Sequence, residues 1–147
     1  FSDKNKVVVI GQGNVALDCA RVLAKGGKGL LHTDITRDAV NVLNEDNVVE
    51  KVVVMGRRGH VQGAFTIKEL RELTKLQEEG HDASFVVSNE ELDMGTTKAT
   101  LAELKAKGSR PKVRIDKLLR DAAKASSERQ RQAEQSLDSR ARKQVEL

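Results

Sequence analysis

Two glycine turns carry the residues of this sequence whose types and spacing are suited to binding a nucleotide. The first turn is GQGNVA at residues 11–16, which fits the G-x-G-x-x-A pattern of dinucleotide-binding loops. In that pattern Gly11 permits a tight turn, Gly13 lets the backbone approach a pyrophosphate, and Ala16 allows close packing of a helix on a strand. The following helix would direct its free N–H groups at the phosphates. We therefore predict a pyrophosphate-binding loop, and a purely structural turn is the alternative.

The second turn places two arginines, Arg57 and Arg58, directly after Gly56. In a Rossmann unit the end of the second strand lies beside the adenosine ribose, where an acidic residue binds the 2′-hydroxyl of NAD. Two guanidinium groups instead offer planar paired donors to a 2′-phosphate, which predicts NADP(H) as the cofactor. Asp34 lies about 20 residues beyond Gly13, at the spacing of an NAD-type acid. Because a poor strand precedes Asp34, the arginines are the preferred reading, with a solvated pair as the alternative.

The elements that would position these turns alternate between strands and helices. Short apolar runs predict strands at 6–10 and 52–55, with a weaker strand at 84–87 and the beginning of another at the final KQVEL. Helical spacing of apolar residues, with glycine or proline at the ends, predicts helices at 15–25, 36–43, 64–76 and 98–106 and after 111, and Asn14 is a candidate cap for the first of them. This order predicts an α/β fold: a Rossmann-like parallel sheet with flanking helices and an extra helical C-terminal segment.

Composition limits the remaining functional classes. The chain has 147 residues and 2% aromatic residues, which fits a single domain with an aliphatic core. The single Cys19 lies in a helical pattern, which predicts a packed thiol and no disulfide framework. No run is long and apolar enough to predict a membrane span, and no histidine or cysteine spacing predicts a metal site. The motifs also supply no catalytic residue. This fits a protein that binds a hydride-carrying cofactor, because hydride transfer needs no protein nucleophile and only orientation of the cofactor.

Basic residues are concentrated toward the end of the chain. The net charge is +4, and from Ser109 onward eleven Lys or Arg stand against six Asp or Glu. Such a surplus is typical of proteins that meet an acidic protein, a membrane surface or nucleic acid, and also of a solvated helix face. The absence of aromatic stacking residues in this region disfavours nucleic acid. Few apolar residues occur at 126–143, which predicts a mobile surface segment that is partly helical.

Three long stretches carry a resemblance to a known family. They are VVVIGQGNVALDCARVL at 7–23, TDI at 33–35 and MGRRGHVQGAFTIKELREL at 55–73. Together they resemble the NADP-binding domain of the adrenodoxin reductase family, the mitochondrial-type ferredoxin–NADP(+) reductases. The match is close over residues 7–76 and faint beyond. It implies that residues 1–147 are a single NADP(H)-binding domain excised from a longer mitochondrial flavoprotein.

The resemblance also implies an activity for the parent protein. Its FAD domain, outside this chain, would take hydride from NADPH and pass electrons to an acidic ferredoxin- or adrenodoxin-type iron–sulfur protein. The chain alone is then expected to be inactive, because it lacks FAD. Two alternatives remain: the NADPH domain of another FAD-linked oxidoreductase of the glutamate-synthase small-subunit type, or a non-catalytic nucleotide- or nucleic-acid-binding module.

Individual residues can be assigned from the same resemblance. It implies cofactor contacts, in addition to the loop glycine Gly11, at Gln12, Gly13, Asn14, Val15, Arg57, Arg58 and Glu69. It implies docking of the iron–sulfur partner at Arg71, Arg110 and Arg114, although Val113 stands where the family is often basic. His60 replaces a family proline and Gly63 replaces a larger residue. Both changes are expected to loosen the loop beside the phosphate.

Overall fold

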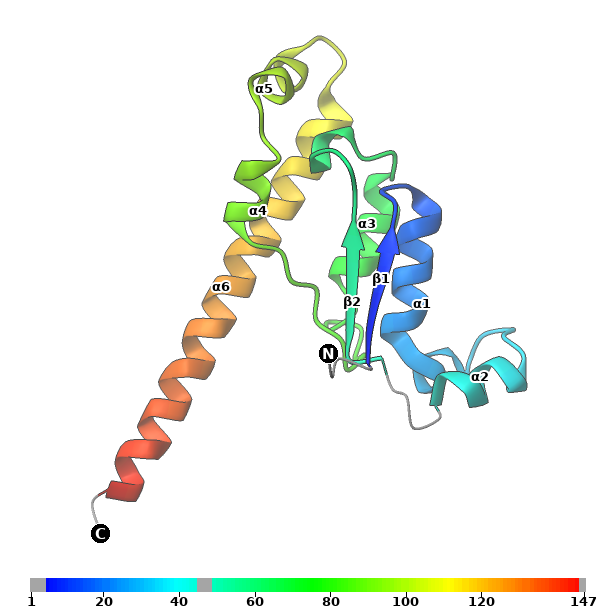
Figure 1. Cartoon of the computed structure of the whole chain (residues 1–147), viewed down its shortest axis with the longest axis vertical. Coiled ribbons are helices and arrows are strands. Elements are labelled where there is room, and N and C mark those ends of the chain that lie inside the picture. Colours follow the sequence, from blue (N-terminus) through cyan, green and yellow to red (C-terminus); the bar gives the residue numbers. More distant parts are fainter. Residues whose placement is uncertain (1–4, 45–48, 146–147) are drawn as a thin grey trace.

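The computed structural model describes residues 5–44 and 49–145, and within the last helix it describes side chains as far as residue 133. Strands and helices alternate over the first half, and helices alone follow (Figure 1). In chain order the elements are β1 (Lys6–Ile10), α1 (Asn14–Leu30), α2 (Arg37–Asn44), β2 (Lys51–Met55), the 3-10 turn η1 (His60–Gln62), α3 (Ile67–Thr74), α4 (Asn89–Met94), α5 (Lys98–Lys105) and α6 (Arg110–Val145).

The two strands form a parallel sheet that brings both glycine turns to one edge. β1 pairs with β2 in a register that joins Val8 to Val53 and Ile10 to Met55. The backbone N–H of Gly11 donates to the carbonyl oxygen of Met55 at 2.8 Å, which continues the ladder into the first turn. Since parallel strands end at the same side, the turns after Ile10 and Met55 lie next to each other (Figure 1). The expected parallel α/β arrangement is confirmed.

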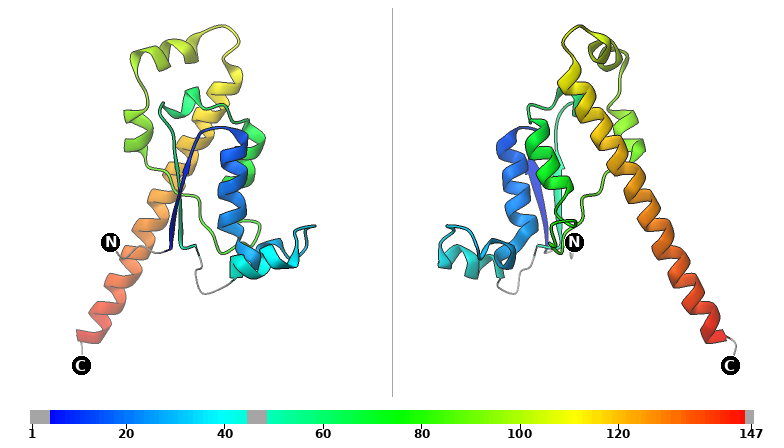
Figure 2. Two further views of the ribbon diagram at one scale, coloured as in Figure 1. Left: turned by 45° about the vertical axis from the view of Figure 1, so that its right-hand side comes forward. Right: turned by 180° about the vertical axis from the view of Figure 1, so that it is seen from behind.

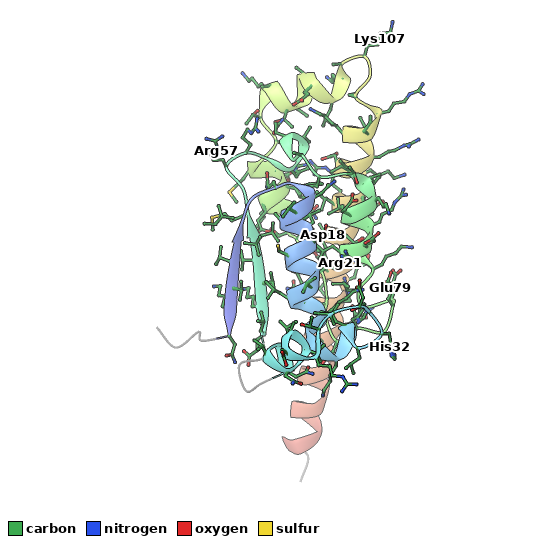
Figure 3. The ribbon with its side chains drawn as sticks, turned by 90° about the vertical axis from the view of Figure 1, so that its right-hand side faces the viewer. Asp18, Arg21, His32, Arg57, Glu79 and Lys107 are labelled. Carbon is green, nitrogen blue, oxygen red and sulfur yellow. The ribbon has the colours of Figure 1, made fainter. Side chains whose placement is uncertain are left out.

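Helices cover one face of this sheet. α1 packs against both strands, α3 packs between α1 and the first half of α6 (Figure 2), and an aliphatic core lies between these helices and Val54 of β2. Its buried members are Leu17, Phe65, Leu70, Leu73, Leu76, Leu92, Ile115, Leu119 and Ala123. Figure 3 shows the strands at one side of the molecule with no helix beyond them. Accordingly Val8 and Ile10 are 46% and 84% exposed, although a continuous apolar run is typical of a strand that is buried on both faces.

The strand predicted at 84–87 is absent from the described residues. The segment keeps the alternation of a strand, because Ala83, Phe85 and Val87 pack against the core while Val86 is exposed. Its observed long-range polar contact is to a helix: the hydroxyl of Ser126 donates to the carbonyl oxygen of Phe85 at 3.4 Å. The segment therefore follows the core without pairing with β2. The alternation of apolar and polar residues at 84–87 therefore reflects which side chains are buried. A β-strand also needs a neighbouring strand to which its backbone can hydrogen-bond.

Helix α6 is longer than the sequence predicts. It is continuous through 126–143 and as far as Val145, so the strand expected at the chain end is wrong over the described residues. Figure 1 shows its second half extending away from the rest of the molecule. Side chains of residues 134–143 lie outside the described set, and the mobility of 126–143 stays a prediction. On α1, Cys19 is exposed rather than packed, which corrects a second expectation.

Candidate nucleotide-binding site

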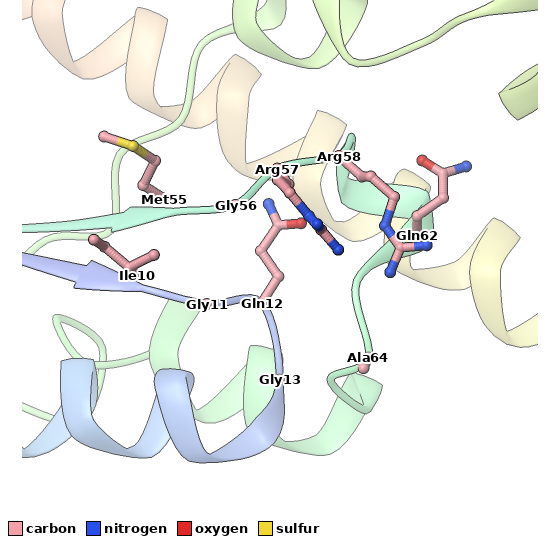
Figure 4. A pocket seen from close by; sticks show the side chains of 10 residues that line it. All are labelled: Ile10, Gly11, Gln12, Gly13, Met55, Gly56, Arg57, Arg58, Gln62 and Ala64. Carbon is pink, nitrogen blue, oxygen red and sulfur yellow. The ribbon is translucent and has the colours of Figure 1, made fainter.

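The two turns form the walls of one cleft at the carboxyl edge of the sheet (Figure 4). The cleft has a volume of about 360 Å³, within the range of roughly 300–1,000 Å³ usual for small-molecule sites. It is lined by Ile10, Gly11, Gln12, Gly13, Met55, Gly56, Arg57, Arg58, Gln62 and Ala64. Residues 45 positions apart in the sequence thus share one site, because the strands that precede them are parallel neighbours.

Gly11 and Gly13 are required for different reasons. Gly11 has a φ of 149°, which side chains rarely adopt, and a Cβ there would lie 3.3 Å from the Cβ of the buried Ala16. Gly13 has ordinary extended angles of −118° and 175°, and a Cβ built there meets nothing within 4 Å. The protein therefore has no internal need for glycine at 13. The open space in front of that backbone fits a ligand that approaches closely, such as a pyrophosphate.

The amino-terminal end of α1 offers backbone donors to the cleft. Gly13 is the N-cap of α1 and supplies no capping side chain. Asn14 does not cap the helix as expected, because its Oδ1 accepts from the backbone N–H of Thr66 at 2.8 Å. The first amides of α1 are thus left for a ligand, and the positive end of the helix dipole favours an anion.

Residues 64–66 are fastened to the first turn. The N–H of Ala64 donates to the carbonyl oxygen of Gln12 at 2.6 Å, and Gly13 and Ala64 form a parallel bridge. Together with the bond from Thr66 to Asn14, these contacts keep 64–66 extended. Helix α3 consequently begins at Ile67 rather than at 64, where helical spacing had placed its start. The same contacts hold Ala64 in the cleft wall.

Arg57 and Arg58 supply the positive charge of the cleft. Both side chains are exposed and extend over the cleft, with Arg57 beside the side chain of Gln12 (Figure 4). Gln12 packs directly over Gly56, where any Cβ would collide with it. Within the part of the chain that the structure describes, neither arginine is within 4 Å of a carboxylate. Two adjacent guanidinium groups without an ion pair favour a doubly charged anion.

The loop after the arginines is held by a buried histidine. His60 Nε2 lies 2.7 Å from Asp116 Oδ1 on α6, and the His60 side chain is 8% exposed. Asp116 also accepts from Arg120, which extends to Asp93 on α4. His60 was expected to loosen this loop in place of a proline; instead it ties the loop to α6. Gly63 leaves room for the ring of Phe65, which a larger side chain would displace.

Sequence reasoning missed Gln62 and its support. Gln62 lines the cleft, and its Nε2 donates to Glu103 Oε2 at 2.8 Å. Lys112 on α6 pairs with the other oxygen of Glu103. The hydrogen bond from Lys112, followed by that from Gln62, lowers the pKa of the Glu103 carboxyl. These contacts join residues 41 and 9 positions apart, so no local motif could have revealed them.

The remaining predicted cofactor residues are not part of the lining of the cleft. Asn14 and Val15 begin α1, and Val15 is 76% exposed. Glu69 lies on α3 with a buried Oε2 that has no hydrogen-bond partner among the described residues. A buried carboxylate oxygen without a donor is costly, so Glu69 is suited to a donor supplied by a ligand. Its predicted contact with the nucleotide stays a prediction.

The predicted docking residues lie away from the cleft on two packed helices. Arg110 and Arg114 are one turn apart on α6, and both are exposed. Arg71 is exposed on α3, which packs against α6. Val113 lies between the two α6 arginines and is 44% exposed. The three arginines thus lie on two helices that pack against each other. Their role in docking an iron–sulfur protein stays a prediction.

Neither a membrane span nor a metal site is found in the described residues. No helix there combines the length and apolar character needed to cross a membrane. No group of three or more His, Cys, Asp or Glu side chains there is placed to hold a metal ion.

Known proteins share both the sequence and the fold of this chain. The mitochondrial NADPH:adrenodoxin oxidoreductase of Arabidopsis thaliana is 39% identical over 122 residues, which are 83% of this chain and 23% of that protein. The human protein of the same name is 54% identical over 69 residues, 47% of this chain and 14% of that protein. A solved structure of the oxidoreductase FprA from Mycobacterium tuberculosis superposes with a TM-score of 0.61 at 39% identity, covering 82% of this chain. The chain belongs to the NADPH:adrenodoxin oxidoreductase family.

The family relationship covers only part of each relative. The chain spans about a quarter of the FprA chain and less of the human protein. No protein-family model matches the chain. One FprA structure was determined in complex with NADPH. Several adrenodoxin oxidoreductases are named mitochondrial, whereas FprA is bacterial.

Proposed function

We propose that this chain binds NADP(H) and is the NADPH-binding part of an FAD-dependent reductase. One observation carries the proposal: two parallel strands end at a single cleft that combines an uncapped helix N-terminus with two arginines free of ion pairs among the described residues. The cleft offers backbone donors for a pyrophosphate on one wall and guanidinium groups for a second phosphate on the other. NADP(H) carries both groups, and NAD(H) carries only the pyrophosphate.

Each wall has a distinct part in holding the cofactor. The turn at Gly11–Gly13 and the first amides of α1 bind the pyrophosphate, because Gly13 leaves the approach open and the helix dipole favours the anion. Arg57 and Arg58 bind the 2′-phosphate. The contact of Glu69 with the nucleotide is proposed from the family resemblance alone, because its unpartnered oxygen is buried. The bound cofactor supplies the hydride, and the chain's own residues bind and orient it.

The proteins that would accept electrons from the bound NADPH are proposed from the relatives. NADPH:adrenodoxin oxidoreductases are named for NADPH and for adrenodoxin, which supports an adrenodoxin-type iron–sulfur partner for this chain. The FAD of the parent protein and the acidic character of the partner are proposed from the family resemblance. Arg71, Arg110 and Arg114 provide exposed positive charge suited to that partner. The mitochondrial relatives support a mitochondrial location.

Replacing the two arginines tests the cofactor proposal. Arg57→Ala combined with Arg58→Ala should weaken NADPH binding at least tenfold, because each charge-assisted hydrogen bond contributes about 1.5–3 kcal/mol. Binding is measured by titrating the 147-residue chain and following NADPH fluorescence. A matched control, Lys28→Ala with Arg37→Ala, removes the same charge from exposed residues on α1 and α2, near the other end of α1. Equal NADPH affinity in both double variants would refute the 2′-phosphate role.

A further inference from the structure

A carboxylate outside the cleft supports the wall that faces the arginines. Glu103 on α5 accepts from Gln62 Nε2 at 2.8 Å through Oε2 and pairs with Lys112 Nζ through Oε1. Its side chain is 35% exposed and that of Lys112 is 40% exposed. Glu103 therefore links three elements, η1, α5 and α6, at a point next to the cleft. None of the motifs that indicated the nucleotide site includes it.

Glu103 fixes the direction of the Gln62 side chain. The amide nitrogen of Gln62 has two hydrogens, and its two acceptors are Glu103 Oε2 and, at 3.4 Å, the hydroxyl of Thr100. Both acceptors belong to α5, so the amide points toward α5 while the rest of the side chain lines the cleft. Figure 4 shows the amide of Gln62 turned away from the guanidinium group of Arg58. The position of this wall thus depends on Glu103.

The same carboxylate carries a negative charge whose field reaches Arg58, and Lys112 balances part of that charge. Hydrogen bonds from Lys112 and Gln62 lower the pKa of Glu103 most, and the charge of Arg58 lowers it further. Glu103 is therefore ionised at neutral pH, and its charge acts on Arg58 without forming an ion pair with it. A bound 2′-phosphate would experience that charge as a repulsion, which opposes the attraction of the arginines.

We propose that Glu103 is a specificity-determining residue of the cofactor site, which positions Gln62 in the cleft wall and limits the affinity for the 2′-phosphate. The inference rests on the proposed binding of NADP(H). The two effects have opposite signs. The hydrogen bond to Gln62 shapes the wall that the phosphate meets, and the charge weakens the hold of Arg58 on that phosphate. A substitution that keeps the bond and removes the charge separates them.

Glu103→Gln is that substitution when its one remaining side-chain oxygen accepts from Gln62. Its amide group then faces Lys112, whose positive charge is left without its partner. The probes are 2′,5′-ADP, which carries the 2′-phosphate, and 5′-AMP, which lacks it, titrated calorimetrically at low ionic strength. Removal of the carboxylate charge, which also frees the charge of Lys112, should raise the affinity for 2′,5′-ADP about two- to fivefold, the size of a charge interaction in a water-like medium. Affinity for 5′-AMP should stay unchanged, and the gain should shrink at 0.5 M salt. Glu103→Ala also removes the acceptor of Gln62, so its affinity for 2′,5′-ADP should rise less than that of Glu103→Gln.

The control is Glu79→Gln, which removes one negative charge from a residue far from Arg57 (Figure 3). Should the unchanged chain bind 2′,5′-ADP no better than 5′-AMP, the proposed function and this inference fall together. Should it prefer 2′,5′-ADP while Glu103→Gln binds like the unchanged chain, only the inference is overturned. An equal gain in Glu79→Gln would assign the effect to net charge and would also overturn it.

Discussion

Gly11 and Gly13 show how two identical residues in one motif can serve the chain and the ligand separately. The positive φ of Gly11 and its contact with Ala16 are properties of the turn itself. Gly13 has neither an unusual backbone conformation nor a neighbour that a Cβ would meet. The proposed approach of a pyrophosphate to its backbone would explain a glycine at this position. The motif in the sequence names both positions, and the structure distinguishes their roles.

Alanine substitutions at Gly11 and Gly13 should therefore affect different properties, stability for Gly11 and NADPH affinity for Gly13. Gly13→Ala is expected to unfold at nearly the same temperature as the unchanged chain while binding NADPH at least tenfold more weakly, because the Cβ enters the ligand's space. Gly11→Ala should lose about 1–3 kcal/mol of stability through backbone strain. Thermal unfolding and NADPH titration of both variants measure the difference. A Gly13→Ala variant that binds NADPH normally would contradict the assignment of that space.

For individual residues, the sequence predicted which charged side chains lie at the cleft better than it predicted hydrogen-bond partners. Arg57 and Arg58 could be predicted because strand, turn and charge are adjacent in the chain. Asn14 was assigned as a helix cap because Asn caps helices locally, but a backbone N–H from 52 residues away takes its oxygen. Glu103 carried no signal, because its partners Gln62 and Lys112 are brought to it only by folding.

Local sequence patterns predicted where helices and strands form better than they predicted which segments pair in the sheet. The parallel strands β1 and β2 and five of the helices follow from apolar spacing. The segment 84–87 alternates like a strand and has no partner. Helix α4 was missed although Ser88 and Glu91 form a capping box, in which each side chain bonds the other's backbone N–H. That S-x-x-E signal was present in the sequence, but the six-residue helix was too short for its apolar spacing to register.

Helix α6 is the element on which partner docking can be tested. Reversing one charge with Arg110→Glu should weaken crosslinking of the chain to an acidic adrenodoxin-type ferredoxin by several-fold at low salt, because rim charges steer association. Arg131→Glu is the matched control, since Arg131 is exposed on the same helix and was not assigned to docking. Crosslinking yield at increasing salt measures both variants. A similar loss in both would leave the net charge as the cause and would contradict a specific site at Arg110.

At the scale of the whole molecule, one helical layer leaves the other face of the sheet open. Val8, Ile10 and Met55 are 46%, 84% and 53% exposed on that face, next to the cleft. The aliphatic core lies entirely between the helices and the opposite face. The FprA structure superposes on 82% of the chain with a TM-score of 0.61. The sequence predicted a parallel sheet with flanking helices, but the sequence of a strand cannot show which of its faces the helices cover.

The proposed function requires that one cleft bind both the pyrophosphate and the 2′-phosphate of NADP(H). Its most direct test is the ratio of the affinities of the unchanged 147-residue chain for NADPH and NADH, measured by calorimetry at one salt concentration. Two arginines on one phosphate predict NADPH binding at least tenfold tighter than NADH binding. Equal affinities for the two cofactors would contradict the claim.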